Sequence, residues 1–111
     1  MKITEVKAVY TGGNVWLFFG RLDNGNSFIV DDDGWVGIFD EDSEAATDYE
    51  YDNWCEWCDK HMIKELEDKK EREQFCMDML DRLEQYEYGS DNNGGFTQGL
   101  IEGYRKWFKE I

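Results

Sequence analysis

The chain has 111 residues, a net charge of −14 at pH 7 and a hydrophobic fraction of 41%. This size suits one core, so we expect residues 1–111 to form a single domain. The negative charge argues against direct binding to nucleic acid or to a membrane surface, and no apolar run reaches the roughly 18 residues of a membrane helix. Three cysteines are too few for a disulfide framework, which favours a cytoplasmic location.

The first third of the chain has the pattern of four short strands. Residues 2–10, 15–22, 27–31 and 35–39 are rich in apolar and β-branched residues, and turn residues separate them. The Asn24-Gly25 pair is typical of a type I′ turn. Successive apolar residues from Val15 to Phe19 are typical of a central strand, covered either on both faces or by helices on one. We predict a four-stranded antiparallel meander over about residues 2–39.

Helical periodicity follows the predicted strands. Trp54, Cys58, Met62 and Leu66 recur every four residues, and similar stripes follow in residues 75–87 and 100–111. The polar stretch 67–73 contains no Gly or Pro, so residues 53–88 could form either one long helix or two helices. We favour two helices because neither apolar stripe extends into the polar stretch. We therefore predict an α+β fold with three helices, at about residues 53–67, 70–88 and 96–110, packed on one face of the sheet.

Half of the carboxylates lie in one segment without a basic residue. Between Arg21 and Lys60 the chain has thirteen of its twenty-six acidic side chains. Carboxylates at this density must be solvated, paired with a cation, or available to a positively charged partner. The simplest interpretation is a solvated face that maintains solubility.

The more specific interpretation is a binding surface for a basic protein. Such a surface would resemble the charge of a nucleic-acid backbone and would occupy a groove built for it. In acidity and size the chain is similar to small phage or mobile-element inhibitors that act as DNA mimics, a likeness of composition and not of motif. We expect a non-enzymatic interaction protein without a cofactor. The predicted partner-binding residues are Asp31, Asp32, Asp33, Asp40, Glu41, Asp42, Glu44, Asp48, Tyr49, Glu50, Tyr51 and Asp52.

The alternative function is a small metal-dependent or thiol-dependent enzyme or sensor. Cys55, Cys58 and His61 are three apart, and Cys76 could supply a fourth zinc ligand. Positions i, i+3 and i+6 of a helix drift by about 60° over about 9 Å, which is too far for one tetrahedral ion. Small apolar cysteines filling a helix face are therefore the favoured interpretation, and we predict no metal site there.

Gly95, Gly99 and Gly103 are spaced by four residues along the last predicted helix. Each glycine costs a helix about 1 kcal/mol relative to alanine, and together they form a groove that another backbone can approach closely. The groove would most simply face the domain's own sheet or a neighbouring helix. A homodimer contact through these glycines is the other interpretation.

Overall fold

The computed structural model describes residues 2–12, 15–48, 51–87 and 98–111. An antiparallel sheet in the order β1-β2-β3-β4-β5 forms its centre. Its strands are β1 (Ile3–Gly12), β2 (Val15–Leu22), β3 (Ser27–Val30), β4 (Val36–Phe39) and β5 (Met62–Glu65). The other elements are a 3-10 helix, η1 (Ser43–Asp48), and three α-helices, α1 (Tyr51–His61), α2 (Lys69–Glu87) and α3 (Gln98–Glu110). The predicted α+β class with an antiparallel sheet and three helices is confirmed; the predicted number of four strands is wrong.

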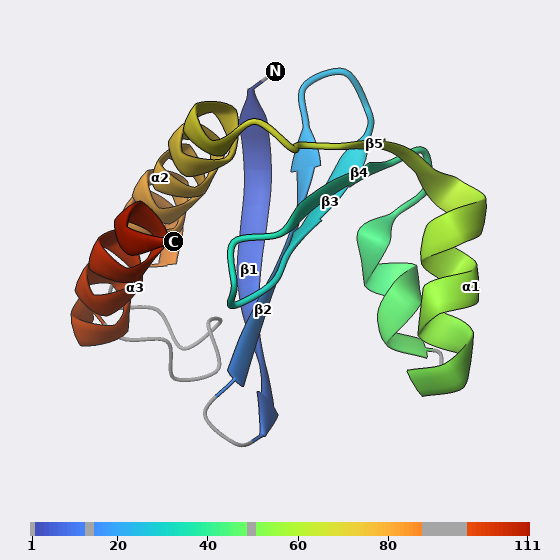
Figure 1. The fold of residues 1–111 in the computed structure, drawn as a ribbon, viewed down its shortest axis with the longest axis horizontal. Coiled ribbons are helices and arrows are strands. Elements are labelled where there is room, and N and C mark those ends of the chain that lie inside the picture. The colour runs from blue at the N-terminus through green and yellow to red at the C-terminus, as the bar shows by residue number, and fades with distance from the viewer. Residues whose placement is uncertain (1, 13–14, 49–50, 88–97) are drawn as a thin grey trace.

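The helices cover both faces of the sheet and not one face as predicted. Figure 1 shows α2 and α3 on one side of the strands, with η1 and α1 on the other. The cause is the strict alternation of side chains along a strand. In β2, Phe18 faces the core under α2 and α3, whereas Phe19 faces the core under η1 and α1. In β3, Phe28 and Ile29 divide between the same two cores. Two buried faces need two covering layers.

Both central hairpins turn in the same way. At the β2–β3 turn, the amide of Leu22 donates to the carbonyl of Asn26, and the amide of Gly25 donates to the carbonyl of Leu22. Gly25 has a φ of 90°, and Gly34 in the β3–β4 turn, hydrogen-bonded in the same pattern, has a φ of 84°. This is a three-residue loop that ends on a left-handed glycine. The predicted turns are confirmed in position, but type I′ is wrong, because the Gly25 amide closes the turn instead of lying at its centre.

Strand β5 takes the place of the end of the first predicted helix. Helix α1 ends at His61, and residues 62–65 pair with β4. The amide of Leu66 then donates to the carbonyl of Val36, 3.0 Å away. The periodic stripe misled the prediction because its members serve two cores: Cys58 packs under α1, but Leu66 packs under α2. The chain must pass from one layer to the other, and it does so along the open edge of β4, satisfying that edge's hydrogen bonds.

The second and third helices lie close to their predicted positions. Helix α2 begins after Asp68, whose carboxylate accepts a hydrogen bond from the amide of Glu71 at 2.9 Å and so caps the helix. The two helices are separate from α1, as favoured from the sequence. Among the described residues, no helix has the length and apolar composition that crossing a membrane requires.

Gly20 generates a test of the packing between β1, β2 and β3. A Cβ atom at Gly20 would lie 2.1 Å from the carbonyl oxygen of Glu5 and 2.5 Å from the ring of Phe28. We expect Gly20→Ala to lower the free energy of unfolding by about 1–3 kcal/mol, because a backbone atom cannot move aside. Gly103→Ala is the matched control: a Cβ there meets nothing within 4 Å, so the free energy of unfolding should rise by up to about 1 kcal/mol. Urea unfolding of both variants at low protein concentration measures the difference, and a neutral Gly20→Ala would contradict this packing.

Candidate functional site

The segment from residue 40 to residue 61 forms one layer over the β1–β4 part of the sheet. We call its described residues, 40–48 and 51–61, the acidic layer. It leaves the sheet at the end of β4 and returns to the same place. The amide of Asp40 donates to the carbonyl of His61 at 3.0 Å, and the carboxylate of Asp40 lies 3.0 Å from Nδ1 of the same histidine. The two ends of the layer are therefore fastened to each other.

Aromatic packing holds the acidic layer on the sheet. Trp57 of α1 packs at a tilt against Phe39 with 5.1 Å between ring centroids, and Trp54 meets Phe19 edge-on with centroids 6.3 Å apart. Ala46 of η1 is fully buried in the same cluster. Because α1 buries Trp57 and Cys58 against the sheet, its described charged side chains, Glu56, Asp59 and Lys60, are exposed on its other side. The geometry thus presents charged positions of this segment to solvent.

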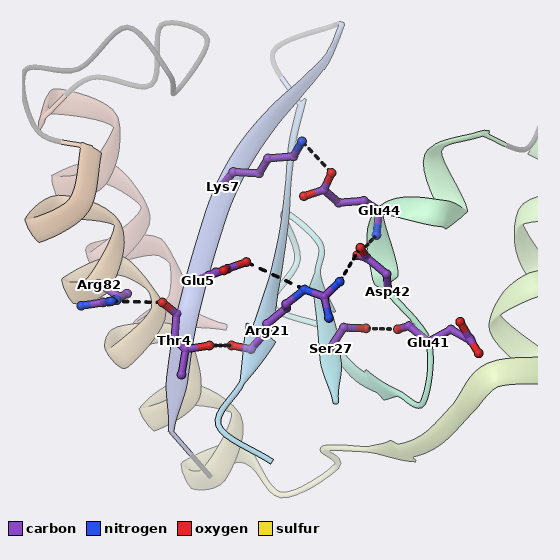
Figure 2. A network of polar contacts seen from close by, with 9 residues as sticks. All are labelled: Thr4, Glu5, Lys7, Arg21, Ser27, Glu41, Asp42, Glu44 and Arg82. Atoms are coloured by element: carbon purple, nitrogen blue, oxygen red, sulfur yellow. Dashed lines mark hydrogen bonds and ion pairs between the residues drawn. The ribbon is translucent and has the colours of Figure 1, made fainter. Parts of the chain in front are cut away.

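Two of the predicted partner-binding carboxylates pair with basic side chains of the sheet, in addition to Asp40, which contacts His61. Figure 2 shows that Asp42 and Glu44 reach back to bases of the sheet. Asp42 lies 2.6 Å from Nη2 of Arg21, and Glu44 lies 3.0 Å from Nζ of Lys7. Asp42 also accepts a hydrogen bond from the amide of Glu44, which caps η1. These side chains are about half exposed, so each ion pair adds at most about 1 kcal/mol. Their contribution is to fix the position of η1.

Sequence reasoning missed Lys7 and Arg21 as structural partners of the acidic segment. Both side chains occupy the same face of the sheet as Phe19, since Lys7 is opposite Phe19 in the β1–β2 register and Arg21 follows it by two residues. The alternation of side chains between the two faces of each predicted strand was the sequence signal from which their position could have been predicted. Arg21 also lies 3.8 Å from Glu5, so a base and two acids meet at this edge of η1.

Other carboxylates of the acidic layer are exposed. Glu41 uses its backbone carbonyl to accept a hydrogen bond from Ser27, and its carboxylate points away from the sheet (Figure 2). Glu56 and Asp59 are exposed on α1, one turn apart. Within the described ranges these three carboxylates have no ion-pair partner. From residue 40 to residue 61 the sequence holds nine carboxylates and one lysine, whereas residues 66–111 hold eleven carboxylates and seven bases. Of these, the structure describes six carboxylates and Lys60 in residues 40–61, and nine carboxylates and seven bases in residues 66–111, so the acidic layer is the helical layer with fewer bases.

Asp31, Asp32 and Asp33 lie apart from the acidic layer. They form the β3–β4 turn at the opposite end of β4 from Asp40, and the carbonyl of Asp32 accepts a hydrogen bond from Trp107 of α3 at 2.7 Å. The structure therefore does not join the twelve predicted residues into one surface. Among the others, Tyr49 and Glu50 lie outside the described residues, as do the side chains of Asp48, Tyr51 and Asp52.

The cysteine and histidine candidates are not brought together. Cys58 packs in the core under α1, and Cys76 packs in the core under α2, so the sheet lies between them. Cys55 is exposed, and His61 bonds to Asp40 and stacks on Trp57. In the described part of the chain no group of three or more histidine, cysteine or acidic side chains could hold a metal ion. The four candidate ligands cannot bind one ion in this fold.

The pKa values of the buried thiols oppose thiol chemistry. Burial, together with the nearby Cys55 and Asp59, raises the pKa of Cys58 to about 11. Burial raises the pKa of Cys76 to about 12. Since the thiolate is the nucleophile, both side chains are inert near neutral pH.

The two described glycines of the last helix do not face the sheet. Gly99 and Gly103 are both exposed on α3, and Gly95 lies outside the described residues. The side of α3 that packs inward carries Ile101 and Phe108 instead. The interpretation that these glycines approach the domain's own sheet is therefore wrong for the two that are described.

The fold and site together define a small α+β protein in which one antiparallel sheet supports two unlike helical layers, one of them acidic. Comparison with known proteins finds no matching family model, no similar curated protein and no similar solved structure.

Thiol labelling tests the placement of the cysteines. We expect iodoacetamide at neutral pH to modify Cys55 rapidly in the folded protein, and Cys58 and Cys76 only after denaturation, because these two thiols are buried and protonated. Peptide mass spectrometry reads each site. Cys55→Ser should remove the fast phase. Rapid modification of Cys58 in the native protein would contradict its burial.

The turn carboxylate Asp31 gives a pH-dependent test. Its Oδ1 accepts hydrogen bonds from the amides of Asp33 and Trp35, both at 2.9 Å, yet burial raises its pKa above the ordinary value, and the charges of Asp33 and Asp32 add to this effect. A raised folded pKa means that the group's contribution to stability is present at low pH and lost as the pH rises through the folded pKa. We expect Asp31→Asn, which keeps the acceptor oxygen and removes the charge, to raise the Tm at pH 7 but not at about pH 3.

The control for this test is an exposed carboxylate of the other hairpin turn, one position further along its loop. Asp23→Asn removes the same unit of charge from an exposed turn position, and it reports how much of the change comes from net charge alone. Thermal unfolding at several pH values measures all three proteins. A lower Tm for Asp31→Asn at pH 7 would show that the ionised form is the one that the turn requires.

Proposed function

We propose that this protein is a non-enzymatic interaction protein whose acidic layer binds a basic surface of another protein. The observation that carries the proposal is the difference in charge between the two helical layers. Glu41, Glu56 and Asp59 are exposed on a layer whose sequence contains one lysine, and packing against the sheet fixes that layer. Concentrated charge of one sign speeds the arrival of an oppositely charged partner and disfavours partners of like charge.

Apolar side chains next to the acidic layer support a protein as the partner. Met62 and Ile63 follow α1 directly and are 36% and 55% exposed. Exposed charges raise the association rate and the specificity of binding more than the affinity. Most of the binding energy comes from a few apolar or aromatic contacts. An exposed methionine and isoleucine beside the carboxylates would supply such contacts. The partner surface that best suits this combination of carboxylates and apolar side chains is a nucleic-acid-binding groove lined by lysine and arginine side chains.

The three cysteines bear on the compartment of the interaction. The two buried thiols lie in separate cores and cannot form a disulfide with each other without rearrangement of the fold. Free thiols persist in a reducing environment. The free thiols support our proposal that the interaction takes place in the cytoplasm.

Charge reversal with a matched control tests the proposal. The test variant is Glu41→Lys, Glu56→Lys and Asp59→Lys together. Asp40 and Asp42 are left unchanged because they fasten the layer through His61 and Arg21. The control is Glu67→Lys, Asp78→Lys and Glu110→Lys, three exposed positions outside the acidic layer with the same change in net charge.

Each protein is used to capture partners from host lysate at about 50 mM salt, followed by elution toward about 500 mM. We expect the same basic protein to bind the wild type and the control, to be lost with the test variant, and to elute early in the gradient. A DNA fragment should compete for that protein if its binding groove is the contact. Equal loss with the control variant would mean that only total charge matters, and capture that survives the test variant would contradict the proposed surface.

A further inference from the structure

Helix α3 carries a shallow groove on its exposed side. The groove measures about 300 Å³ and has an apolar floor. Trp107 is 42% exposed, and its indole nitrogen is held by the carbonyl of Asp32 at 2.7 Å, which fixes the ring in place. A Cβ atom at Gly103 would have no heavy atom within 4 Å. The residues that line the groove are Asp32, Gly99, Leu100, Gly103, Tyr104 and Trp107.

The groove has a shape that fits a copy of itself. Gly99 and Trp107 lie four residues on either side of Gly103, so each is about 40° and about 6 Å from it on the helix. A two-fold axis across α3 at Gly103 sets a second α3 antiparallel to the first. This operation exchanges the position four residues before Gly103 with the position four residues after it. The large Trp107 side chain of each copy then faces Gly99 of the other, which has no side chain of its own.

The charges along the groove are also self-complementary. Glu102 and Lys106 lie on the same edge of α3. The antiparallel two-fold arrangement brings Glu102 of one copy beside Lys106 of the other, and the reverse pair forms by symmetry. Lys106 has no ion-pair partner among the residues described, and one oxygen of Glu102 bonds to Gln98 at 3.0 Å. Arg105 is paired with Asp81 and Glu84, so the remaining charges of α3, Lys106 and Lys109 against Glu102 and Glu110, are balanced, which limits the repulsion between two copies of this acidic chain at this helix.

We propose that α3 packs against α3 of a second copy of this chain, with the two Gly103 residues at the two-fold axis. Glycines four apart let the two backbones approach closely, and Trp107 fills the space over the opposite Gly99. The contact uses one helix from each copy, so its buried area is smaller than the roughly 800 Å² per partner of a standard interface. The dimer is therefore weak and forms at high protein concentration. This interface lies across the sheet from the acidic layer, so the two surfaces can be occupied independently.

Sedimentation velocity from about 10 µM to about 1 mM, at about 150 mM salt, tests the dimer. We expect the wild type to shift from monomer toward dimer over this range. Gly103→Leu should remain a monomer throughout, because its side chain separates the two helices. The space around Gly103 allows this substitution in the monomer, so the Tm should not fall. Lys60→Ala, at an exposed position on α1 across the sheet from α3, should dimerise as the wild type does. A wild type that stays monomeric at about 1 mM would overturn the proposal.

A charge exchange gives a second test that does not depend on Gly103. Glu102→Lys alone and Lys106→Glu alone should each weaken the dimer at least severalfold, because each places like charges together across the two-fold axis. The double variant Glu102→Lys with Lys106→Glu restores both cross pairs and should recover dimerisation. Equal dimerisation of the wild type and all three variants would rule out this antiparallel arrangement. The variant with Glu41, Glu56 and Asp59 reversed should dimerise normally, which separates this inference from the proposed function.

Discussion

Burial of both faces of the central strands is the constraint on which the rest of the molecule depends. Phe18 and Phe19 are neighbours in β2, and they point to opposite sides and are both almost fully buried. A sheet with apolar side chains on both faces must be covered twice. The chain meets this need with α2 and α3 on one side and with η1 and α1 on the other. The difference in charge between the two helical layers then becomes a difference between two sides of the molecule.

Local signals in the sequence were sufficient for the strands and turns up to residue 39. The glycines at positions 25 and 34 mark both hairpins, because each adopts a positive φ that other residues avoid. Strand β5 could not be predicted in this way. Met62 and Leu66 continue the helical stripe of α1, and only the unpaired edge of β4, a long-range feature, makes an extended conformation preferable there. The successive apolar residues of β2 contained the information about two covered faces, but a single strand does not say which helices cover it.

The acidic site was only partly visible in the sequence for a related reason. The density of carboxylates is plain from the sequence, but its distribution in space depends on the turn and the sheet. Asp31 and Asp42 belong to the same acidic run, yet one is held in a hairpin turn near α3 and the other is paired with Arg21 on the opposite face. Some acidic residues thus serve the fold and leave others, such as Glu56, for solvent or a partner. Strand register puts Lys7 on the same face of the sheet as Phe19. Without this register the carboxylates that pair with the sheet cannot be told from those that remain exposed.

The contact between Asp40 and His61 has a consequence for how this fold can vary. Because the segment between them starts and finishes at one point beside β4, it is a closed excursion between neighbouring strands. Closing such a loop costs little more when it is lengthened or shortened by several residues. The excursion can therefore be replaced by a different sequence without any change in strand order, provided that the replacement still covers Phe19, Ile29 and Phe39. The exposed surface of the segment between Asp40 and His61 can thus change while the sheet stays the same.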